Sequence, residues 1–495
     1  MQILRELADF LRQHRIYQSK TLLSKNWKRD KSDEFLEKIQ QDEFHSEEEL
    51  ATYFYRKKDR RYTALKGRFY DNMIASILLV DFKNQRMHPF SRKYYTIVRE
   101  LAAAKILLGK TFPNAAIYIA NRCLKRAYEI GFYDLVYDAI RVLKNHYGVR
   151  LKKEAKFIEY DEKLKAARAV LDLEDRSYTN YAKVLIAYKK DRSDLSKCHS
   201  VAKTCFEELE PYLDTCPSIR FQLTTRLIRN IVNATSYDFQ IIIDDSSKDI
   251  QFLLEKYNGY TTNLSVFLFQ KTIACVRLGR YEEGLRTINQ TLSFLDDRNI
   301  NWFSARYYQF FIYMQSGQYA AARDVYNQTT KHRRYKSTMP AVKEDWEVGG
   351  AYLAYVIEKG LLDTEKKIRF SAGKLLNSVP EYSKDKRVKN IPILVIQILF
   401  RIQRRQTNQA IESIAAIEQY CGRNLSYNEA VRSNAFIKML QEISKNSFRK
   451  NAVLRKVTRY VKKLSDVPIH QSGKNFDLEI IPYEKLWEFA ISGLR

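Results

Sequence analysis

Apolar residues recur at helical spacing along most of this chain. Near the N-terminus, Leu4, Leu7 and Leu11 share one helical face, and a second run carries Leu65 and Phe69 in the same way. Further runs with this spacing cover residues 95–108, 115–130, 133–147, 181–256, 391–405, 408–420, 427–444 and 450–465. Within them, the three isoleucines at 241–243 fit either a short strand or part of a buried helix. The pattern predicts long helices and an all-α fold.

A short phrase, Gly-x-Tyr, separates several of these runs and predicts tight turns between paired helices. It occurs as Gly131-Phe132-Tyr133, Gly279-Arg280-Tyr281 and Gly317-Gln318-Tyr319. The last two copies lie 38 residues apart, which is close to the period of stacked helical hairpins. Such a stack grows by burying each hairpin against its neighbours, so its length is not limited by one central core.

The residues that follow the second and third turns match position by position. Gly284, Ile288 and Thr291 correspond to Ala322, Tyr326 and Thr329. A small residue followed four positions later by a bulky one lets two helices approach closely and fills the space beside them. In these residues the chain resembles the tetratricopeptide-repeat family, over residues 265–330 and less closely over 115–146. The 38-residue spacing, and Lys271 and Thr272, depart from the family pattern.

The resemblance implies a right-handed superhelical array of antiparallel helix hairpins, similar also to uncharacterised bacterial helical-repeat proteins. In the tetratricopeptide family a groove lined mainly by the first helices binds the partner. The positions that this implies here for a partner groove are Phe269, Gln270, Ile273, Arg277, Tyr307, Tyr308, Phe311 and Gln315. Aromatic residues at helical spacing also fit a buried core, so both roles stay open for them.

The end of the chain changes character. Residues 475–481 alternate like a short strand, and residues 482–491 read as a closing helix that carries Trp487. We therefore expect a small C-terminal capping element that covers the last hairpin. Five regions result: 1–90, an N-terminal helical region; 91–260, divergent repeats; 261–380, the clearest repeats; 381–470, C-terminal helical repeats; and 471–495, a strand with a capping helix.

Composition supports long helices and adds a strong positive charge. Only 15 Gly and 9 Pro in 495 residues argue against a turn-rich β fold, and 34 Tyr with 26 Phe supply ample apolar surface to bury. The formal net charge of +27 favours anionic partners such as nucleic acid, acidic protein segments or anionic membrane surfaces. A solvated helix face explains clustered cations as well. The candidate anionic-partner patch comprises Arg56, Lys57, Lys58, Arg60, Arg61, Arg333, Arg334, Lys445, Arg449, Lys450, Arg455, Lys456, Arg459, Lys462 and Lys463.

Motifs for chemistry are weak. Residues 104–111 match a permissive phosphate-loop pattern ending in Gly109-Lys110-Thr111, but they close an Ala/Leu-rich helical run, where a working loop would follow a strand. Cys198, His199, Cys205 and Cys216 lack the close pairs of a structural zinc site. The aspartates at 238, 244, 245 and 249 fit an exposed helix boundary as well as a divalent-cation site. We expect no enzyme activity, no cofactor and no bound metal.

These observations predict a non-catalytic cytoplasmic scaffold or adaptor that binds a protein or peptide in its groove. The alternative is a helical-repeat protein that binds RNA or DNA backbone through its basic helix faces. The six cysteines, at 123, 198, 205, 216, 275 and 421, form no paired framework and are expected to be reduced. The longest apolar stretch, residues 391–400, is half of a membrane span, so no membrane insertion is expected.

Overall fold

The computed structural model describes residues 3–6, 31–41, 44, 46–78, 80, 89–190, 196–236, 238–257, 261–295, 297, 299–362, 390–424, 431–467, 469 and 479–494. Throughout these ranges the regular secondary structure is helical and no strand is present. The predicted all-α class is therefore confirmed for this part of the chain. Residues 241–243 belong to a helix, which resolves the alternative left open by their sequence.

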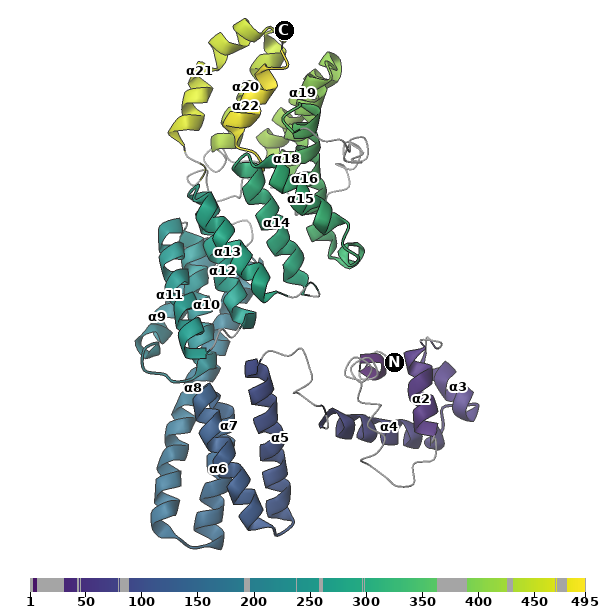
Figure 1. The fold of residues 1–495 in the computed structure, drawn as a ribbon, viewed down its shortest axis with the longest axis vertical. Coiled ribbons are helices and arrows are strands. Elements are labelled where there is room, and N and C mark those ends of the chain that lie inside the picture. The colour runs from purple at the N-terminus through teal and green to yellow at the C-terminus, as the bar shows by residue number, and fades with distance from the viewer. Residues whose placement is uncertain are drawn as a thin grey trace. The chain divides into compact units, whose positions relative to one another are not determined.

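The chain divides into two compact units. The first comprises Met1–Asp175 with Cys216–Arg220, and the second comprises Arg176–Thr215 with Phe221–Arg495. Helices of the first unit are α2 (Lys31–Gln40), α3 (Glu47–Tyr55), α4 (Arg60–Leu78), α5 (Pro89–Gly109), α6 (Pro113–Ile130), α7 (Tyr133–Asn145) and the beginning of α8 (Glu154–Lys190), with a π turn at His146–Arg150 (Figure 1). Helices α2 to α4 enclose a small aromatic core, in which Phe35, Tyr62 and Phe69 are fully buried.

The second unit continues with further helices in sequence order. They are α9 (Ser196–Leu209), α10 (Ile219–Ser236), α11 (Phe239–Tyr257), α12 (Thr261–Arg277), α13 (Tyr281–Phe294), α14 (Ile300–Gln315), α15 (Tyr319–Thr330), α16 (Pro340–Glu358), α18 (Asn390–Gln403), α19 (Thr407–Asn424), α20 (Val431–Lys445), α21 (Lys450–Asp466) and α22 (Tyr483–Ile491). From α11 to α16, and again from α18 to α21, each helix packs against the next. Sequential packing of neighbours is the arrangement that the hairpin turns predicted.

The three predicted turn glycines end helices in the same way. Gly131, Gly279 and Gly317 have φ angles of 69°, 69° and 75°, a left-handed conformation that glycine adopts without a side-chain clash. In each turn the residue after the glycine donates its backbone N–H to a carbonyl of the preceding helical turn, for example Arg280 to Cys275 at 2.8 Å. This pattern satisfies carbonyls that the helix end leaves open and reverses the chain within three residues.

The matched repeat positions also have matched environments. Gly284 and Ala322 are buried, and a methyl group at Gly284 would touch the Ile312 side chain at 3.4 Å. Thr291 and Thr329 are buried, and the hydroxyl of each donates a hydrogen bond to the backbone carbonyl four residues earlier. The small and hydroxyl residues thus let each second helix lie close against its neighbours.

Helix α16 approaches the α14–α15 hairpin most closely at two consecutive glycines. A methyl group added to Gly349 would lie 2.6 Å from the ring of Phe310, and one added to Gly350 would lie 2.5 Å from the hydroxyl of Tyr326. Trp346 of the same helix is fully buried against both rings. The two glycines therefore make room for the aromatic core that joins the hairpin to α16.

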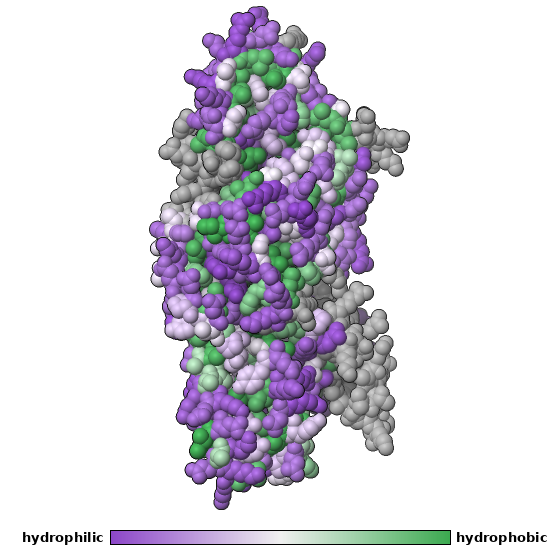
Figure 2. All heavy atoms as spheres, turned by 60° about the vertical axis from the view of Figure 1, so that its left-hand side comes forward, coloured by the Kyte–Doolittle hydropathy of each residue, from purple (hydrophilic) through white to green (hydrophobic). Residues whose placement is uncertain are grey.

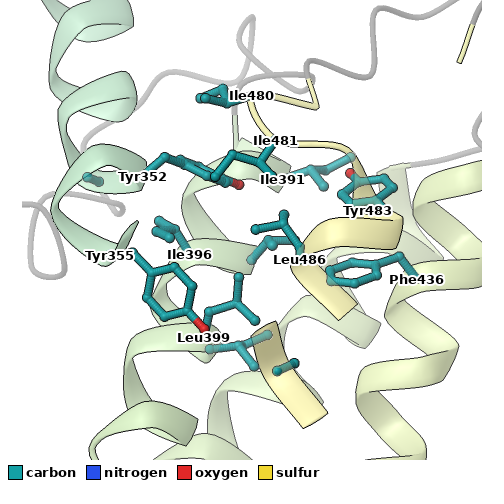
Figure 3. Close-up of a cluster of buried hydrophobic side chains, with 14 of the residues drawn as sticks. Tyr352, Tyr355, Ile391, Ile396, Leu399, Phe436, Ile480, Ile481, Tyr483 and Leu486 are labelled. Atoms are coloured by element: carbon teal, nitrogen blue, oxygen red, sulfur yellow. The ribbon is translucent and has the colours of Figure 1, made fainter. Parts of the chain in front are cut away.

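Residues 479–494, the C-terminal segment, lie inside the second unit. Ile480, Ile481, Tyr483 and Leu486 point into a shared apolar cluster with side chains of α16, α18 and α20 (Figure 3). The predicted closing helix is present as α22, and its Trp487 is buried. Residues 475–478 of the predicted strand lie outside the described residues, and residues 479–481 form no strand, so that prediction is wrong for them.

A buried ion pair fixes the C-terminal segment. Arg432 of α20 is 1% exposed, and its guanidinium makes two hydrogen bonds to the carboxylate of Glu479, at 2.6 and 2.9 Å. The same guanidinium bonds Glu484 at 2.7 Å and the carbonyls of Leu464 and Val467 at the end of α21. Burial acts to lower the pKa of Arg432, but the hydrogen bonds to Glu479 and Glu484 outweigh it and raise that pKa.

Replacing Arg432 should therefore destabilise the second unit strongly. We expect Arg432→Met to lower the free energy of unfolding by about 3 to 5 kcal/mol, because Glu479 would remain buried without its partner. The double variant with Glu479→Met should lose much less, since neither charge is then buried. Urea unfolding followed by circular dichroism measures both.

A matched control is the Arg404–Glu358 pair, which has the same two-bond geometry but is partly exposed. Arg404→Met should change stability by no more than about 1 kcal/mol. If Arg432→Met and Arg404→Met lower the free energy of unfolding equally, the buried pair stabilises the protein no more than the exposed one.

Candidate partner-binding site

The first helices of the two clearest hairpins meet at Tyr308 of α14. The Phe269 ring of α12 packs edge-on against the Tyr308 ring, with centroids 5.9 Å apart. Tyr308 keeps partial solvent exposure, yet burial raises its pKa to about 12. Phe269 and Tyr308, together with the ionisable side chains that act on Tyr308, are here called the Tyr308 cleft.

Ionisable groups from three other helices lie close enough to act on Tyr308. Asp345 of α16 and Tyr188 of α8 raise the pKa of Tyr308, whereas Arg277 of α12 lowers it. Arg277 also lies over the ring of Phe239 in α11, 6.0 Å from its centroid. The cleft therefore combines aromatic surface with one cation and one anion, a composition typical of sites that bind polypeptide.

The structure places the eight predicted groove residues in two environments. Six are partly exposed, and they are Phe269, Gln270, Ile273, Arg277, Tyr307 and Tyr308. Phe311 and Gln315 are buried, with 6% and 7% of their surface exposed. Gln315 donates its side-chain amide to the carbonyl of Glu479 and accepts a hydrogen bond from Tyr281, so the chain's own C-terminal segment occupies that position.

Tyr307 contributes more to the core than to the cleft. Its ring packs edge-on against Trp346 at 5.5 Å and lies near Phe310 and Phe311. Asp345 and Tyr188 are cleft residues that the sequence did not reveal. Asp345 precedes the buried Trp346, and this position next to a core anchor is the only signal that could have pointed to it.

The cations of α21 form the most uniform basic surface among the described residues. Val453, Val457 and Leu464 face the core, and residues 450–465 contain no acidic side chain. Arg459 lies over the ring of Tyr460, 4.5 Å from its centroid. Lys450, Arg455, Lys456, Arg459 and Lys462 are exposed, and among the described residues no carboxylate pairs with them.

The flanking predicted cations differ in their surroundings. Lys445 and Arg449 are exposed, and Lys445 lies 3.7 Å from the carboxylate of Glu442. Lys463 is half-buried, as is Arg334, whereas Arg333 is exposed in the turn after α15.

The N-terminal basic cluster is partly neutralised. Lys58 pairs with Glu47 and Glu48, and Arg61 pairs with Asp59 at 2.8 Å. Arg56, Lys57 and Arg60 are exposed. Tyr62 and Phe69, two aromatic residues within and beside this cluster, are fully buried in the core of α2 to α4. Tyr55 is partly exposed, and Arg61 lies over its ring, 5.3 Å from the centroid, so the cluster presents charge with an aromatic ring beside it.

Figure 2 shows one face of the molecule coloured by hydropathy. Hydrophilic residues, in purple, cover most of it, and hydrophobic residues, in green, form small separate patches. No helix among the described residues is long and apolar enough to cross a membrane.

Several candidate metal ligands form hydrogen bonds or ion pairs with other protein side chains. Arg229 of α10 bonds Asp249 at 2.5 Å, and Asn233 donates to Asp245 at 2.8 Å, in a closely packed group of side chains. Two arginines, at 226 and 229, thus supply the positive charge that a cation would bring. His199 bonds Thr235, and all six cysteines are free and buried. Within the described ranges no group of three or more His, Cys, Asp or Glu could hold a metal ion.

The phosphate-loop pattern is part of a helix and its end. Residues 104–109 belong to α5, and Gly109 is its last residue. Lys110 and Thr111 form the turn to α6, where their side chains are exposed. A helix precedes this turn where a nucleotide-binding loop would follow a strand.

A buried polar cluster in the first unit was not anticipated. Glu174 of α8 is 3% exposed and accepts a hydrogen bond from the hydroxyl of Ser218, which is fully buried. Arg220 lies 3.9 Å from Glu174, bonds the carboxylate of Asp134 at 3.1 Å, and donates to the hydroxyl of Tyr94 at 3.1 Å. Burial raises the pKa of Glu174 to about 7, although Ser218 and Arg220 act in the opposite direction. This cluster joins residues 216–220 to α5, α7 and α8 within the first unit.

One sequence signal could have identified Glu174. Tyr160, Ala167 and Glu174 follow one another at seven-residue intervals, and all three are buried. A carboxylate on an otherwise buried helix stripe implies partners inside the protein.

Comparisons with protein-family models, curated proteins and solved structures find no match to this chain. The assignment of function therefore depends on the residues and contacts described above.

The Glu174 cluster should make the stability of the first unit depend on pH. The pKa of Glu174 is about 7 in the folded protein and 4.5 ordinarily, so the folded state holds the extra proton in this window. Stability should fall as pH rises from 4.5 to about 7 and level off above it, by about 3 kcal/mol at 1.36 kcal/mol for each of about 2.5 pKa units.

Scanning calorimetry across this pH range tests the dependence. Glu174→Gln should remove the decline, because a neutral amide keeps the hydrogen bond without titrating. Glu159→Gln is the control in the same unit, since hydrogen bonds from Lys156 and Lys163 lower the pKa of Glu159 to about 2, below the window. A decline that persists in Glu174→Gln would assign the pH dependence to another group.

Proposed function

We propose that this chain is a non-catalytic cytoplasmic scaffold that binds a protein or peptide partner in the Tyr308 cleft. The hairpins of the second unit would form a right-handed, tetratricopeptide-like array, with first helices facing the partner. One observation carries the proposal. Tyr308 of α14 is partly exposed but strongly desolvated, and it lies among Phe269 and Arg277 of α12 and Asp345 of α16.

The cleft's composition supports polypeptide binding. Phe269 and Ile273 offer apolar contact, and aromatic side chains contribute much of the energy in protein interfaces. Arg277 and Asp345 carry opposite charges, which would orient a peptide by its carboxylate and ammonium groups.

The protonation state of the cleft supports a binding role more than a catalytic one. With a pKa of about 12, the phenol of Tyr308 keeps its proton at neutral pH, and burial also raises the pKa of Tyr307. A general base or nucleophile requires a pKa near the working pH, whereas burial raises the pKa values of Tyr307 and Tyr308 further above it.

Peptide selection and titration test the proposal. Peptides selected from a random display library on the wild-type protein should bind Tyr308→Ala and Arg277→Ala at least about tenfold more weakly, measured by fluorescence polarisation. Arg277→Ala removes a partly exposed side chain, so it tests the cleft with little effect on the core. Tyr118→Ala, which removes an exposed ring from α6 in the first unit, should bind as the wild type does. Equal binding by all three variants would exclude the Tyr308 cleft as the site.

The basic face of α21 favours a second function, binding of nucleic acid backbone. Five exposed cations on one helix, with no acidic residue in 450–465, match the regular negative charge of a phosphate chain. Tyr460 beside Arg459 adds one ring on which a base could stack.

Salt dependence tests this second function. If the five cations contact phosphates, affinity for a DNA duplex should fall roughly 500-fold between about 50 and about 200 mM salt, measured by fluorescence anisotropy. Changing Arg455, Lys456, Arg459 and Lys462 to Gln should weaken binding to all sequences alike and flatten the salt dependence.

The matched control removes the same charge elsewhere. Lys156, Lys163, Lys165 and Lys203 already have carboxylate partners, and changing them to Gln should leave the salt dependence as it is. An equal loss of affinity in both quadruple variants would mean that net charge, and no particular surface, attracts the nucleic acid.

A further inference from the structure

Two turns of the first unit lie side by side. The α5–α6 turn follows Gly109, and the α7–α8 turn follows the π turn at His146–Arg150. The guanidinium of Arg150 donates to the carbonyl of Leu108 at 3.2 Å, which joins the two turns. Both lie at the lower ends of these helices in Figure 1. Residues 106–112 and 149–153 are here called the hairpin tip.

The hairpin tip displays large apolar side chains to solvent. The exposed fractions are 65% for Ile106, 61% for Phe112, 75% for Val149 and 45% for Leu151. Single exposed apolar residues are ordinary on a protein surface, but four gathered at one end of a helical unit indicate a contact surface.

Backbone hydrogen bonds order the two turns that carry these side chains. In the α7–α8 turn, Leu151 donates to the carbonyl of His146 at 3.1 Å, and Lys153 donates to that of Tyr147 at 2.9 Å. The Tyr147 ring stacks on Tyr160 of α8, with centroids 5.4 Å apart. In the other turn, Phe112 donates to the carbonyl of Leu107 at 2.9 Å. The apolar side chains are thus presented by ordered turns.

Positive charge surrounds the apolar side chains. Lys110, Lys152 and Lys153 are exposed, and the described residues place no carboxylate in contact with them. Arg150 adds a fourth cation, and neither 106–112 nor 149–153 contains an acidic residue. The surface that this tip fits is therefore both anionic and able to accept apolar groups.

An anionic bilayer surface meets both requirements. Its headgroups attract lysines, and the boundary below them accepts aliphatic and aromatic side chains. Nucleic acid would use the lysines, but Ile106, Val149 and Leu151 have no ring to stack on a base. A second copy would bring like charges together. We propose that the hairpin tip docks on an anionic lipid surface, with Phe112 and Val149 entering the headgroup region.

Vesicle co-sedimentation of the full-length protein tests the proposal. The wild type should sediment with vesicles of phosphatidylcholine mixed with phosphatidylglycerol, and should stay in solution with phosphatidylcholine alone. The double variant Phe112→Ser/Val149→Ser should bind at least about tenfold more weakly, and so should the variant with Gln at 110, 152 and 153. Ile74→Ser/Tyr118→Ser is the matched control, because it removes two apolar side chains of similar exposure, 56% and 68%, outside the tip and should bind like the wild type.

Three results would overturn the proposal. The first is a wild type that stays in solution with anionic vesicles. The second is Phe112→Ser/Val149→Ser binding these vesicles as the wild type does, which would make α21 or net charge the source of attraction. The third is a wild-type dimer in sedimentation velocity that the same double variant dissociates, which would make the tip a contact between copies. Circular dichroism confirms that each variant is folded. Peptide binding at the Tyr308 cleft uses other residues, so either proposal can fail without the other.

Discussion

The guanidinium of Arg432 lies in the apolar interior of the second unit, and its position constrains much of what surrounds it. A buried cation is stable only when it is neutralised and all its donors are satisfied. Arg432 meets this condition with Glu479, Glu484 and two carbonyls at the end of α21. It thereby joins α20, α21 and the C-terminal segment at one point. The orientation of the basic face of α21, and the burial of Gln315 beneath Glu479, both depend on this network.

The sequence predicted those helical features that depend only on residues close to them along the chain. The turn glycines at 279 and 317 need only their own backbone conformation to end a helix, so the sequence identified them directly. Gly284 and Ala322 were found by their spacing from these turns, and both are buried as expected. The closing helix at 483–491 followed from its own apolar pattern.

Features that depend on distant partners could not be predicted in the same way. Periodicity placed Gln315 on a groove-facing stripe, but the group that covers it is Glu479, from a segment that sequence spacing could not position. Glu174 occurs in a charged stretch of sequence, and only the fold brings Ser218 and Arg220 to it. The hairpin tip resembled a phosphate loop because Gly109 and Lys110 suit a helix end as well as a nucleotide site. In each case the residue type was visible, and its partner was not.

The hydrogen bond from Gln315 to Glu479 joins positions 164 residues apart. In an ideal repeat array each hairpin contacts only its neighbours, so such an array can fray from one end while the other end stays folded. Here the last residues of the chain are built into the side of α14, and closing that long loop carries an entropic cost that must be met before the contact forms. The second unit should consequently fold slowly and late in synthesis, with α14 gaining its final neighbour only after the C-terminal segment has emerged.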